Sequence, residues 1–334
     1  MAAILEEKGM ISVTVVIPNY NGMKYVEGCL NALYQQEEGT PEFQVLVVDN
    51  ASSDGSDAVI EDKFPRARLI RLKENTGFCH AVNLGIQEAD SPYVILLNND
   101  TKVEPGFVKA LFHAICQEEN CFSVSAKMLM WDRPELVDDA GDRYCALGWA
   151  YSRGKGRPAA DYNKRVEIFA SCAGAAIYRK SVLEKIGYFD ENHFAYLEDI
   201  DIGYRARIYG YRSYYDRKAE AHHYGRASTG SRYNPRKTTL ASANSVYLIA
   251  KNMPLLQQLV NLPFFLFGFL AKTLLFCKKG MGILYVKGLC KGIKLSLSSD
   301  GREKKVPFRT ENLGSYLAIQ WQLYINLFRI IMKT

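Results

Sequence analysis

Four short apolar segments alternate with four segments of helical spacing between residues 13 and 125, and this order constrains the fold more than any other feature. The apolar segments are VTVVIP, FQVLVVDN, ARLIRL and YVILLNND, beginning at residues 13, 43, 67 and 93. Helical spacing follows each of them, over residues 26–35, 56–63, 80–89 and 106–117. Strands that alternate with helices over such short connections predict a mostly parallel, Rossmann-like central sheet flanked by helices.

Polar side chains follow three of these predicted strands, at the point where each strand ends. They are Asn19, Tyr20 and Asn21, then Asp49 and Asn50, then Asn98, Asn99 and Asp100, with a predicted turn over residues 101–106. Asn and Asp often end strands, because their side chains hydrogen-bond to nearby backbone. The carboxyl ends of parallel strands, however, meet at one edge of an open α/β sheet, where such folds bind ligands. Three converging clusters therefore favour a binding crevice.

The sequence contains neither of the two common glycine-rich phosphate-binding motifs. A dinucleotide site would place GxGxxG directly after the first strand, but the chain has IPNYNGMKYVEG there, and it contains no GxxxxGK[ST]. We interpret the clusters as a site for a nucleotide that lies across the strand ends. Pro18 to Asn21 suit a flat ring, Asp49 can accept hydrogen bonds from a base or ribose, and Asn75 with Gly77 allows close backbone approach. Asp100 can hold a divalent cation between two phosphates.

A second polar group, Glu198, Asp199 and Asp201, stands at the start of a predicted helix in YLEDIDIGYRARIYG. Carboxylates are favourable at any helix N-terminus, which is the alternative explanation. Three of them beside an aromatic segment exceed what capping needs, and group transfer to a hydroxyl requires a general base. Asp201 is expected to pair with Arg205, four residues further on.

His222 and His223 follow a predicted strand, YRSYYD, and precede a basic loop predicted over residues 225–239. Imidazole is a suitable ligand for Mn²⁺. The loop either closes over a diphosphate and excludes water or is a solvated linker, and the residues leave both possibilities open. Its basic residues are Arg226, Arg232, Arg236 and Lys237.

Residues 13 to about 229 resemble an inverting family-2 glycosyltransferase of the GT-A fold. The resemblance is carried by VTVVIPNYNG, VLVVDNASSDGS, ENTGFCHAVNLGI, VILLNNDTKVEPGF, the segment from GAAIYRKS to EDIDIGYRARIYGYR, and HHYGRAST. The forms LLNND and EDxD are most similar to bacterial rhamnosyltransferase-like members. The resemblance implies Asp199 as the base, with Glu198 in support, and Mn²⁺ or Mg²⁺ held by Asp100 and His223. In this chain Asn98 replaces the first carboxylate of the family's metal motif, which lowers the negative charge available to the metal.

The nucleotide-sugar site is assigned to eleven residues: Pro18, Asn19, Tyr20, Asn21, Asp49, Asn50, Asn75, Gly77, Asn98, Asn99 and Arg226. We expect a catalytic domain over residues 1–239, with a nucleotide-sugar half at about 13–125 and an acceptor half at about 126–239. Residues 240–334 are expected to form a helical, membrane-associating extension.

The last quarter of the chain differs in charge from the rest. Residues 251–334 hold 13 Lys and Arg against 3 Asp and Glu, a net charge of +10, although the whole chain carries +6. The apolar run at 255–277 is interrupted by Gln257, Gln258, Asn261, Pro263 and Lys272, so we expect peripheral attachment rather than a span. Basic amphipathic helices with Trp and Tyr are typical of an anionic membrane interface. The alternative is a packing arm or a homodimer interface.

The acidic N-terminus, MAAILEEKGM, does not have the form of a secretory signal, and the eight cysteines include no CxxC pair. We therefore expect reduced thiols and a protein on the cytoplasmic face of the bacterial membrane, with no nucleic-acid partner. The expected reaction moves L-rhamnose from dTDP-L-rhamnose to a saccharide or a polyprenyl-diphosphate-linked glycan in cell-surface polysaccharide synthesis. Alternatives are a UDP-hexose or UDP-galactofuranose donor, or a non-catalytic nucleotide-sugar-binding or membrane scaffold protein.

Overall fold

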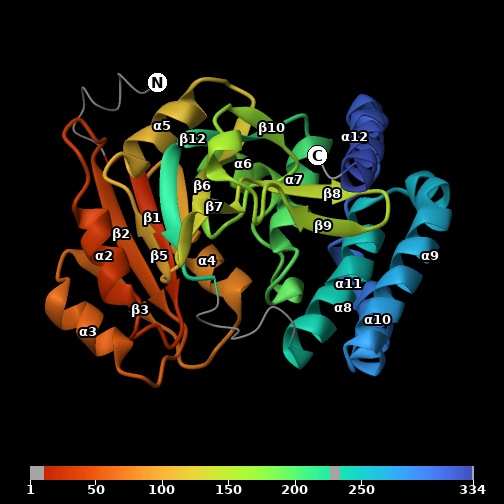
Figure 1. Cartoon of the computed structure of the whole chain (residues 1–334), viewed down its shortest axis with the longest axis horizontal. Helices are drawn as coiled ribbons and strands as arrows, with labels where there is room; N and C mark the ends of the chain where they lie inside the picture. The colour runs from red at the N-terminus through yellow and green to blue at the C-terminus, as the bar shows by residue number, and fades with distance from the viewer. Residues whose placement is uncertain (1–10, 226–233, 333–334) are drawn as a thin grey trace.

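The computed structural model describes residues 11–225 and 234–332, and a ten-stranded sheet forms its centre (Figure 1). Eight strands follow the order β10-β12-β6-β11-β4-β1-β2-β3, while β5 pairs with β12 and β7 pairs with β6. The strands are β1 (Val13–Asn19), β2 (Phe43–Asp49), β3 (Ala67–Arg71), β4 (Tyr93–Leu97), β5 (Thr101–Val103), β6 (Cys121–Met130), β7 (Arg133–Asp139), β10 (Val166–Ile168), β11 (Ala175–Arg179) and β12 (Arg212–His223). A separate hairpin pairs β8 (Asp142–Cys145) with β9 (Trp149–Ser152).

Strands β4, β1, β2 and β3 are parallel, as the alternating sequence pattern predicts. Successive residues of each strand point to opposite faces, so Val15 and Ile17 join one apolar core while Val16 joins the other. Helices α2 (Val26–Tyr34), α3 (Ser56–Lys63) and α5 (Phe107–Cys116) cover the first face, and α4 (Phe78–Gln87) with α6 (Lys180–Ile186) covers the second. Burial on both faces explains why these strands are almost continuously apolar.

The rest of the sheet is mixed. Strand β11 runs antiparallel to both β4 and β6, whereas β6 and β12 are parallel. The predicted turn over residues 101–106 is wrong at its start, because Thr101 to Val103 form β5 and pair with Ala221 to His223. That pairing joins segments far apart in the sequence, and local turn propensity therefore did not indicate it. It also brings His223 beside the end of β4.

The chain ends in a helical region that stands beside the sheet in Figure 1. Its helices are α8 (Pro235–Asn252), α9 (Leu255–Lys278), α10 (Gly282–Leu297), α11 (Ser299–Glu303) and α12 (Leu313–Ile331). Tyr204 and Ile208 of α7 (Glu198–Ile208) pack in one apolar core with Leu248 of α8 and Leu323 of α12. The helical region therefore shares a core with the middle of the chain, the part predicted to bind the acceptor.

The predicted basic loop over residues 225–239 is too long, because α8 already begins at Pro235. The side chain of Asn234 accepts a hydrogen bond from the Lys237 backbone N–H at 2.8 Å and caps the helix. Proline is favourable at the first helical position, where its missing N–H has no helical partner to lose. Arg236 and Lys237 thus belong to the first turn of α8, while Arg226 and Arg232 lie outside the described residues.

Helix α9 buries two amide side chains, together with Phe265 and Gly268, and exposes most of its leucines. Buried Gln257 accepts a hydrogen bond from Tyr204 at 2.7 Å, and buried Asn261 exchanges two hydrogen bonds with Gln320 of α12. The outer face exposes Leu255, Leu256, Leu259, Val260, Leu262, Leu266, Phe267, Leu270, Leu274 and Leu275. By length and composition α9 is also the one helix among the described residues that could cross a bilayer.

Candidate active site

A pocket of about 650 Å³ opens at the carboxyl ends of β1, β2 and β4, the edge at which the polar clusters were expected to meet. One wall comes from the strand ends and the other from the segment leading into α7. Its lining includes Pro18, Asn19, Tyr20, Asn50, Asn75, Gly77, Asn98, Asn99, Asp100, Glu198, Asp199 and His223. The predicted convergence of the clusters on one crevice is therefore confirmed.

The strand-end amides hold one another in place. Asn19 donates hydrogen bonds to Asp49 at 2.7 Å and to Ser56 at 2.9 Å, and its oxygen accepts one from Asn99 at 2.7 Å. Asp49 also accepts from the backbone and hydroxyl of Ser52, so three of the roughly four acceptor positions of its carboxylate are filled. Asp49 and Asn21 do not line the pocket. Asp49 lies behind Asn19, and Asn21 binds the backbone N–H of Ser53 at 2.9 Å.

Asn50 holds the loop of residues 75–77, which connects β3 to α4, in place. Its side chain donates to the Gly77 carbonyl at 3.0 Å and accepts from the Thr76 N–H at 2.9 Å, while Asn75 accepts from the Gly77 N–H at 3.0 Å. Gly77 has φ +90°, and a Cβ there would lie 2.7 Å from the ring of Phe194. The position therefore requires glycine both for its conformation and for the close approach of Phe194.

Asp100 and His223 form a corner of the pocket suited to a divalent cation. Nε2 of His223 lies 3.3 Å from Oδ1 of Asp100, while Nδ1 donates to Asp138 at 2.8 Å. A carboxylate on the far ring nitrogen is the usual support of a metal-binding histidine, because it fixes the tautomer and orients the free nitrogen. Burial opposes the charged ring, but its hydrogen bonds to Asp100 and Asp138 raise the pKa of His223 to about 9. The donor set fits Mn²⁺ or Mg²⁺ once that proton is displaced.

The two candidate catalytic carboxylates stand in the first turn of α7, on the opposite wall. Asp199 accepts a hydrogen bond from the Ala173 N–H at 3.1 Å, and Glu198 is 8% exposed with one oxygen that has no partner among the described residues. Burial and the neighbouring Glu198 raise the pKa of Asp199 well above the ordinary carboxyl range, and burial also raises the pKa of Glu198. A carboxylate with a raised pKa is a stronger base in its ionised form, which suits proton abstraction from a hydroxyl at a pH where the group is ionised.

The segment that leads into these carboxylates is strained. Phe194, Tyr196 and Leu197 have φ of 57°, 73° and 67°, a region that L-residues rarely adopt. Buried Asn244 of α8 donates to the carbonyls of His193, Ala195 and Tyr196 at 2.9, 3.0 and 2.7 Å. Such strain persists only where surrounding contacts hold it, and here α8 supplies them.

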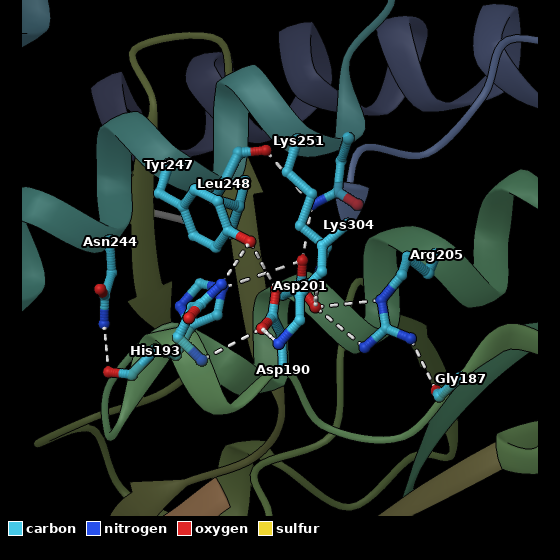
Figure 2. Close-up of polar contacts among 12 residues, drawn as sticks. Gly187, Asp190, His193, Asp201, Arg205, Asn244, Tyr247, Leu248, Lys251 and Lys304 are labelled. Carbon is cyan, nitrogen blue, oxygen red and sulfur yellow. Dashed lines mark hydrogen bonds and ion pairs between the residues drawn. The ribbon is translucent and has the colours of Figure 1, made fainter. Parts of the chain in front are cut away.

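A buried ionic network joins α8 to α7 and to the segment before it, as Figure 2 shows. Nζ of Lys251 lies 2.6 Å from Asp190 and 2.9 Å from Asp201, and Arg205 binds Asp201 at 2.9 Å. The predicted pair of Asp201 and Arg205 is thus confirmed. Against the effect of burial, Lys251 lowers the pKa of Asp190 to about 2, and Lys251 with Arg205 holds that of Asp201 well below its usual range. Asp201 is therefore structural, in contrast to Asp199 two residues earlier.

A third group, Asp139, Asp142 and Cys172, offers ligand atoms within 4.8 Å of one another. The cysteine spacing gave no indication of this group, because its members meet only in the fold. Burial raises the pKa of Asp142 and of the Cys172 thiol well above their ordinary values. Both shifts favour the protonated forms, which are poor ligands, and the corner at Asp100 and His223 fits a cation better.

Several pocket residues were not anticipated from the sequence. Asp138, Lys155, Cys172, Phe194 and Tyr196 line the pocket, and Asp138 fixes His223 from 85 residues away. The acidic run VDDAGD, which contains Asp138, was the available signal, but it resembled any polar turn. The predicted Arg226 lies outside the described residues.

With this geometry established, comparison with known proteins identifies the family. The family described as glycosyl transferase family 2 matches residues 14–187, more than half of the chain. The chain therefore belongs to this family and is a glycosyltransferase.

Two relatives illustrate the range of similarity. Over 266 residues the chain is 28% identical to N-acetylglucosaminyl-diphospho-decaprenol L-rhamnosyltransferase of Mycobacterium tuberculosis, which covers 70% of this chain and 82% of that protein. Over 98 residues it is 34% identical to teichoic acid poly(glycerol phosphate) polymerase of Staphylococcus epidermidis. That match covers 28% of this chain and only 13% of the polymerase.

Two solved structures share the fold. S. aureus TarS, crystallised with UDP-GlcNAc, has a TM-score of 0.57 and 19% identity, with 93% of this chain and 90% of that chain covered. A mannosyltransferase from Pyrobaculum calidifontis, solved with GDP-Man and Mn²⁺, has a TM-score of 0.52 and 16% identity, with 92% and 86% covered. The fold is thus GT-A, a central sheet flanked by helices, with a helical C-terminal region.

Proposed function

We propose that the protein transfers one sugar, with inversion, from a nucleoside-diphosphate sugar to a hydroxyl of a glycan acceptor. The observation that carries this proposal is the position of Asp199, a half-buried carboxylate with a raised pKa that faces the strand-end pocket from the first turn of α7. Asp199 takes the proton of the acceptor hydroxyl as that oxygen attacks the anomeric carbon. Glu198, buried with an oxygen that has no partner among the described residues, stands beside it as a supporting carboxylate.

The donor lies along the opposite wall. Pro18 and Tyr20 contact the flat base, and the loop of Asn75 and Gly77 approaches the nucleotide with its backbone. Asn98 and Asn99 line the same wall, and Asn99 is oriented by its hydrogen bond to Asn19. This arrangement directs the diphosphate toward Asp100 and the sugar toward Asp199.

Asp100 and His223 would hold Mn²⁺ or Mg²⁺. When bound, the cation neutralises the negative charge that the leaving diphosphate acquires. The protein's own contribution is to keep His223 oriented through Asp138 and to present Nε2 beside the Asp100 carboxylate. Asn98 leaves this corner with one carboxylate fewer than the family pattern, so the histidine carries more of the binding.

The favoured donor is dTDP-L-rhamnose and the favoured setting is bacterial cell-surface polysaccharide synthesis. The support is the similarity to the mycobacterial rhamnosyltransferase over most of both chains. A UDP-hexose or UDP-galactofuranose donor is the alternative, and UDP-GlcNAc bound to S. aureus TarS favours uridine nucleotides as the competing class.

The acceptor is a glycan carried on a polyprenyl diphosphate, reached from the cytoplasmic face of the membrane. The outward leucines of α9 and the exposed Trp321 and Phe328 of α12 give the helical region an apolar surface. Lys287, Lys291 and Lys294 add positive charge on α10. Apolar area with adjacent lysines is the composition that lies in an anionic membrane interface.

Calorimetric titration with dTDP and with UDP, each with and without Mn²⁺, tests the donor class. Metal-dependent binding of one nucleotide supports the proposal, whereas binding of neither supports the scaffold alternative. A variant with Asp199→Ala then separates an enzyme from a binding protein. We expect it to bind the nucleotide like the parent but to lose transfer, and equal turnover in this variant would refute Asp199 as the base.

A further inference from the structure

A second groove, of about 470 Å³, lies between α8 and α10 and shares lining residues with the active-site pocket. It is lined by Phe194, Pro235, Arg236, Thr239, Leu240, Leu284 and Lys291. Phe194, Arg236 and Leu240 also line the pocket, so one wall serves both spaces. The shared residues come from α8 and from the segment before α7, and neither Asp100 nor His223 lines the groove.

The groove is positively charged from both sides. Arg236 projects from the first turn of α8, with its guanidinium 5.0 Å from the centre of the Phe194 ring, and Lys291 comes from α10. Neither cation has a carboxylate partner within the described chain. Lys287 and Lys294 stand four residues before and three after Lys291, on the same face of α10. The N-terminus of α8 adds partial positive charge at the same mouth.

The position of α10 relative to α8 is fixed by close packing. Added Cβ atoms at Gly288 and Gly292 would lie 1.8 Å from the Ser242 hydroxyl and 2.3 Å from the Ala243 carbonyl. The two helices therefore touch along their backbones, and Figure 1 shows them side by side. Lys291 is held at a fixed distance from the first turn of α8 rather than on a freely moving element.

Apolar side chains continue outward from the basic groove. Ile283, Val286 and Ile293 are exposed on α10, and α9, which contacts α10, exposes its outward leucines. The sequence of environments is thus a catalytic pocket, then the two cations of the groove, then exposed hydrocarbon. A ligand that matches all three has a sugar, an anionic linker and a lipid chain, in that order.

We propose that this groove binds the diphosphate of a lipid-linked acceptor, with Arg236 and Lys291 contacting the phosphate oxygens and the lipid chain lying over α10 and α9. The inference rests on the proposed glycosyltransferase function and adds the site that selects the acceptor class. The donor's diphosphate is a separate group, because it is directed to Asp100 and His223 on the other wall. Binding of the lipid diphosphate at the groove brings the first sugar of the acceptor into the pocket near Asp199.

Binding of farnesyl diphosphate to the full chain in detergent, measured by calorimetry, tests the site without any glycosyl transfer. We expect Lys291→Glu to weaken binding about tenfold, since a charge-assisted hydrogen bond contributes on that order, and Lys291→Arg to bind normally. Lys278→Glu removes an exposed lysine at the end of α9, outside the groove, and is the matched control for general electrostatic attraction. Affinity for UDP or dTDP with Mn²⁺ should be the same in all three variants.

Unchanged binding in Lys291→Glu would overturn the proposal, as would an equal loss in Lys278→Glu, which would indicate general charge attraction only. A parallel loss of nucleotide affinity would assign the cations to the donor's diphosphate instead. Equal affinity for inorganic diphosphate and farnesyl diphosphate would remove the lipid from the proposal. Transfer that survives Asp199→Ala would sink the proposed catalytic role of Asp199 while leaving the binding result intact, so the two failures are distinguishable.

Discussion

Replacing Lys251 with alanine tests whether the ionic network behind the pocket holds the catalytic helix in place. The lysine binds two carboxylates that are almost completely buried, Asp190 at 2.6 Å and Asp201 at 2.9 Å. Each carboxylate keeps one other cation, Lys304 for Asp190 and Arg205 for Asp201. Removing one partner of a buried ion pair costs roughly 3–5 kcal/mol, and the remaining cations place the expected loss near the lower figure, about 3 kcal/mol.

The pKa of Asp190 gives a second route to the magnitude. Its reduction from the ordinary value of 3.8 to about 2 corresponds to roughly 2–3 kcal/mol of stability near neutral pH. Because the folded-state pKa is depressed, this stability is present above about pH 4 and is lost as the pH falls toward 2. The alanine variant lacks most of it at every pH. The difference in free energy of unfolding between the two proteins should therefore be largest at pH 7 and should narrow below pH 4.

Urea denaturation of the full chain in detergent, followed by tryptophan fluorescence at pH 7 and pH 3, measures both quantities. Lys304→Ala is the matched control, because this lysine binds the same Asp190 but its side chain is 38% exposed. Solvent screening limits such a pair to about 1 kcal/mol or less. An equal effect of the two substitutions, or a Lys251 effect that does not change with pH, would refute the reasoning.

Three further predictions concern the pocket itself. Asp199→Asn should lower kcat by about 10²–10⁴ without changing nucleotide affinity. In the parent enzyme, kcat/KM should fall on acidification with an apparent pKa above the ordinary carboxyl range, because Asp199 must be ionised to accept the proton. A flat pH profile of kcat/KM would contradict this role. Asp138→Asn should weaken Mn²⁺ binding by about 10–100-fold in calorimetry, because His223 loses the partner that orients it, and unchanged affinity would exclude His223 as a ligand. Gly77→Ala should destabilise the protein by more than about 1 kcal/mol in thermal unfolding, since its Cβ would meet Phe194 at 2.7 Å and its φ is +90°. A neutral effect would mean that the loop relaxes freely.

The parallel half of the fold and one wall of the pocket follow from local sequence. Buried parallel strands are apolar without interruption, so the runs VTVVIP and YVILL predicted buried strands. The carboxyl ends of parallel strands lie at one edge of the sheet, and this rule predicted that Asn19, Asn50 and Asp100 would line one pocket. Local sequence also predicted that Asp201, unlike Asp199, pairs with Arg205, because residues four apart lie on the same face of a helix.

Long-range partners are the part that local sequence does not contain. Lys251, which completes the Asp201 site, is 50 residues away, and Asp138, which orients His223, is 85 residues away. Asn244, which supports the strained segment before α7, is 48 to 51 residues from the carbonyls that it binds. Each of these contacts depends on how helices and strands pack, so the residue types alone could not single them out from ordinary polar surface positions.

The amide residues of helix α9 lead to different conclusions when they are counted along the sequence and when they are placed in the fold. Gln257 and Asn261 lie four residues apart and therefore share one helical face, a pattern that weakens a membrane span when it is counted along the chain. In the fold that polar face is buried against Tyr204 and Gln320, and the leucines face outward. In a protein surrounded by water, leucines are usually buried and amide side chains are usually exposed, and α9 shows the opposite arrangement for these residues. This inversion is the physical reason to expect a hydrocarbon environment around α9, with the basic groove of α8 and α10 beside it.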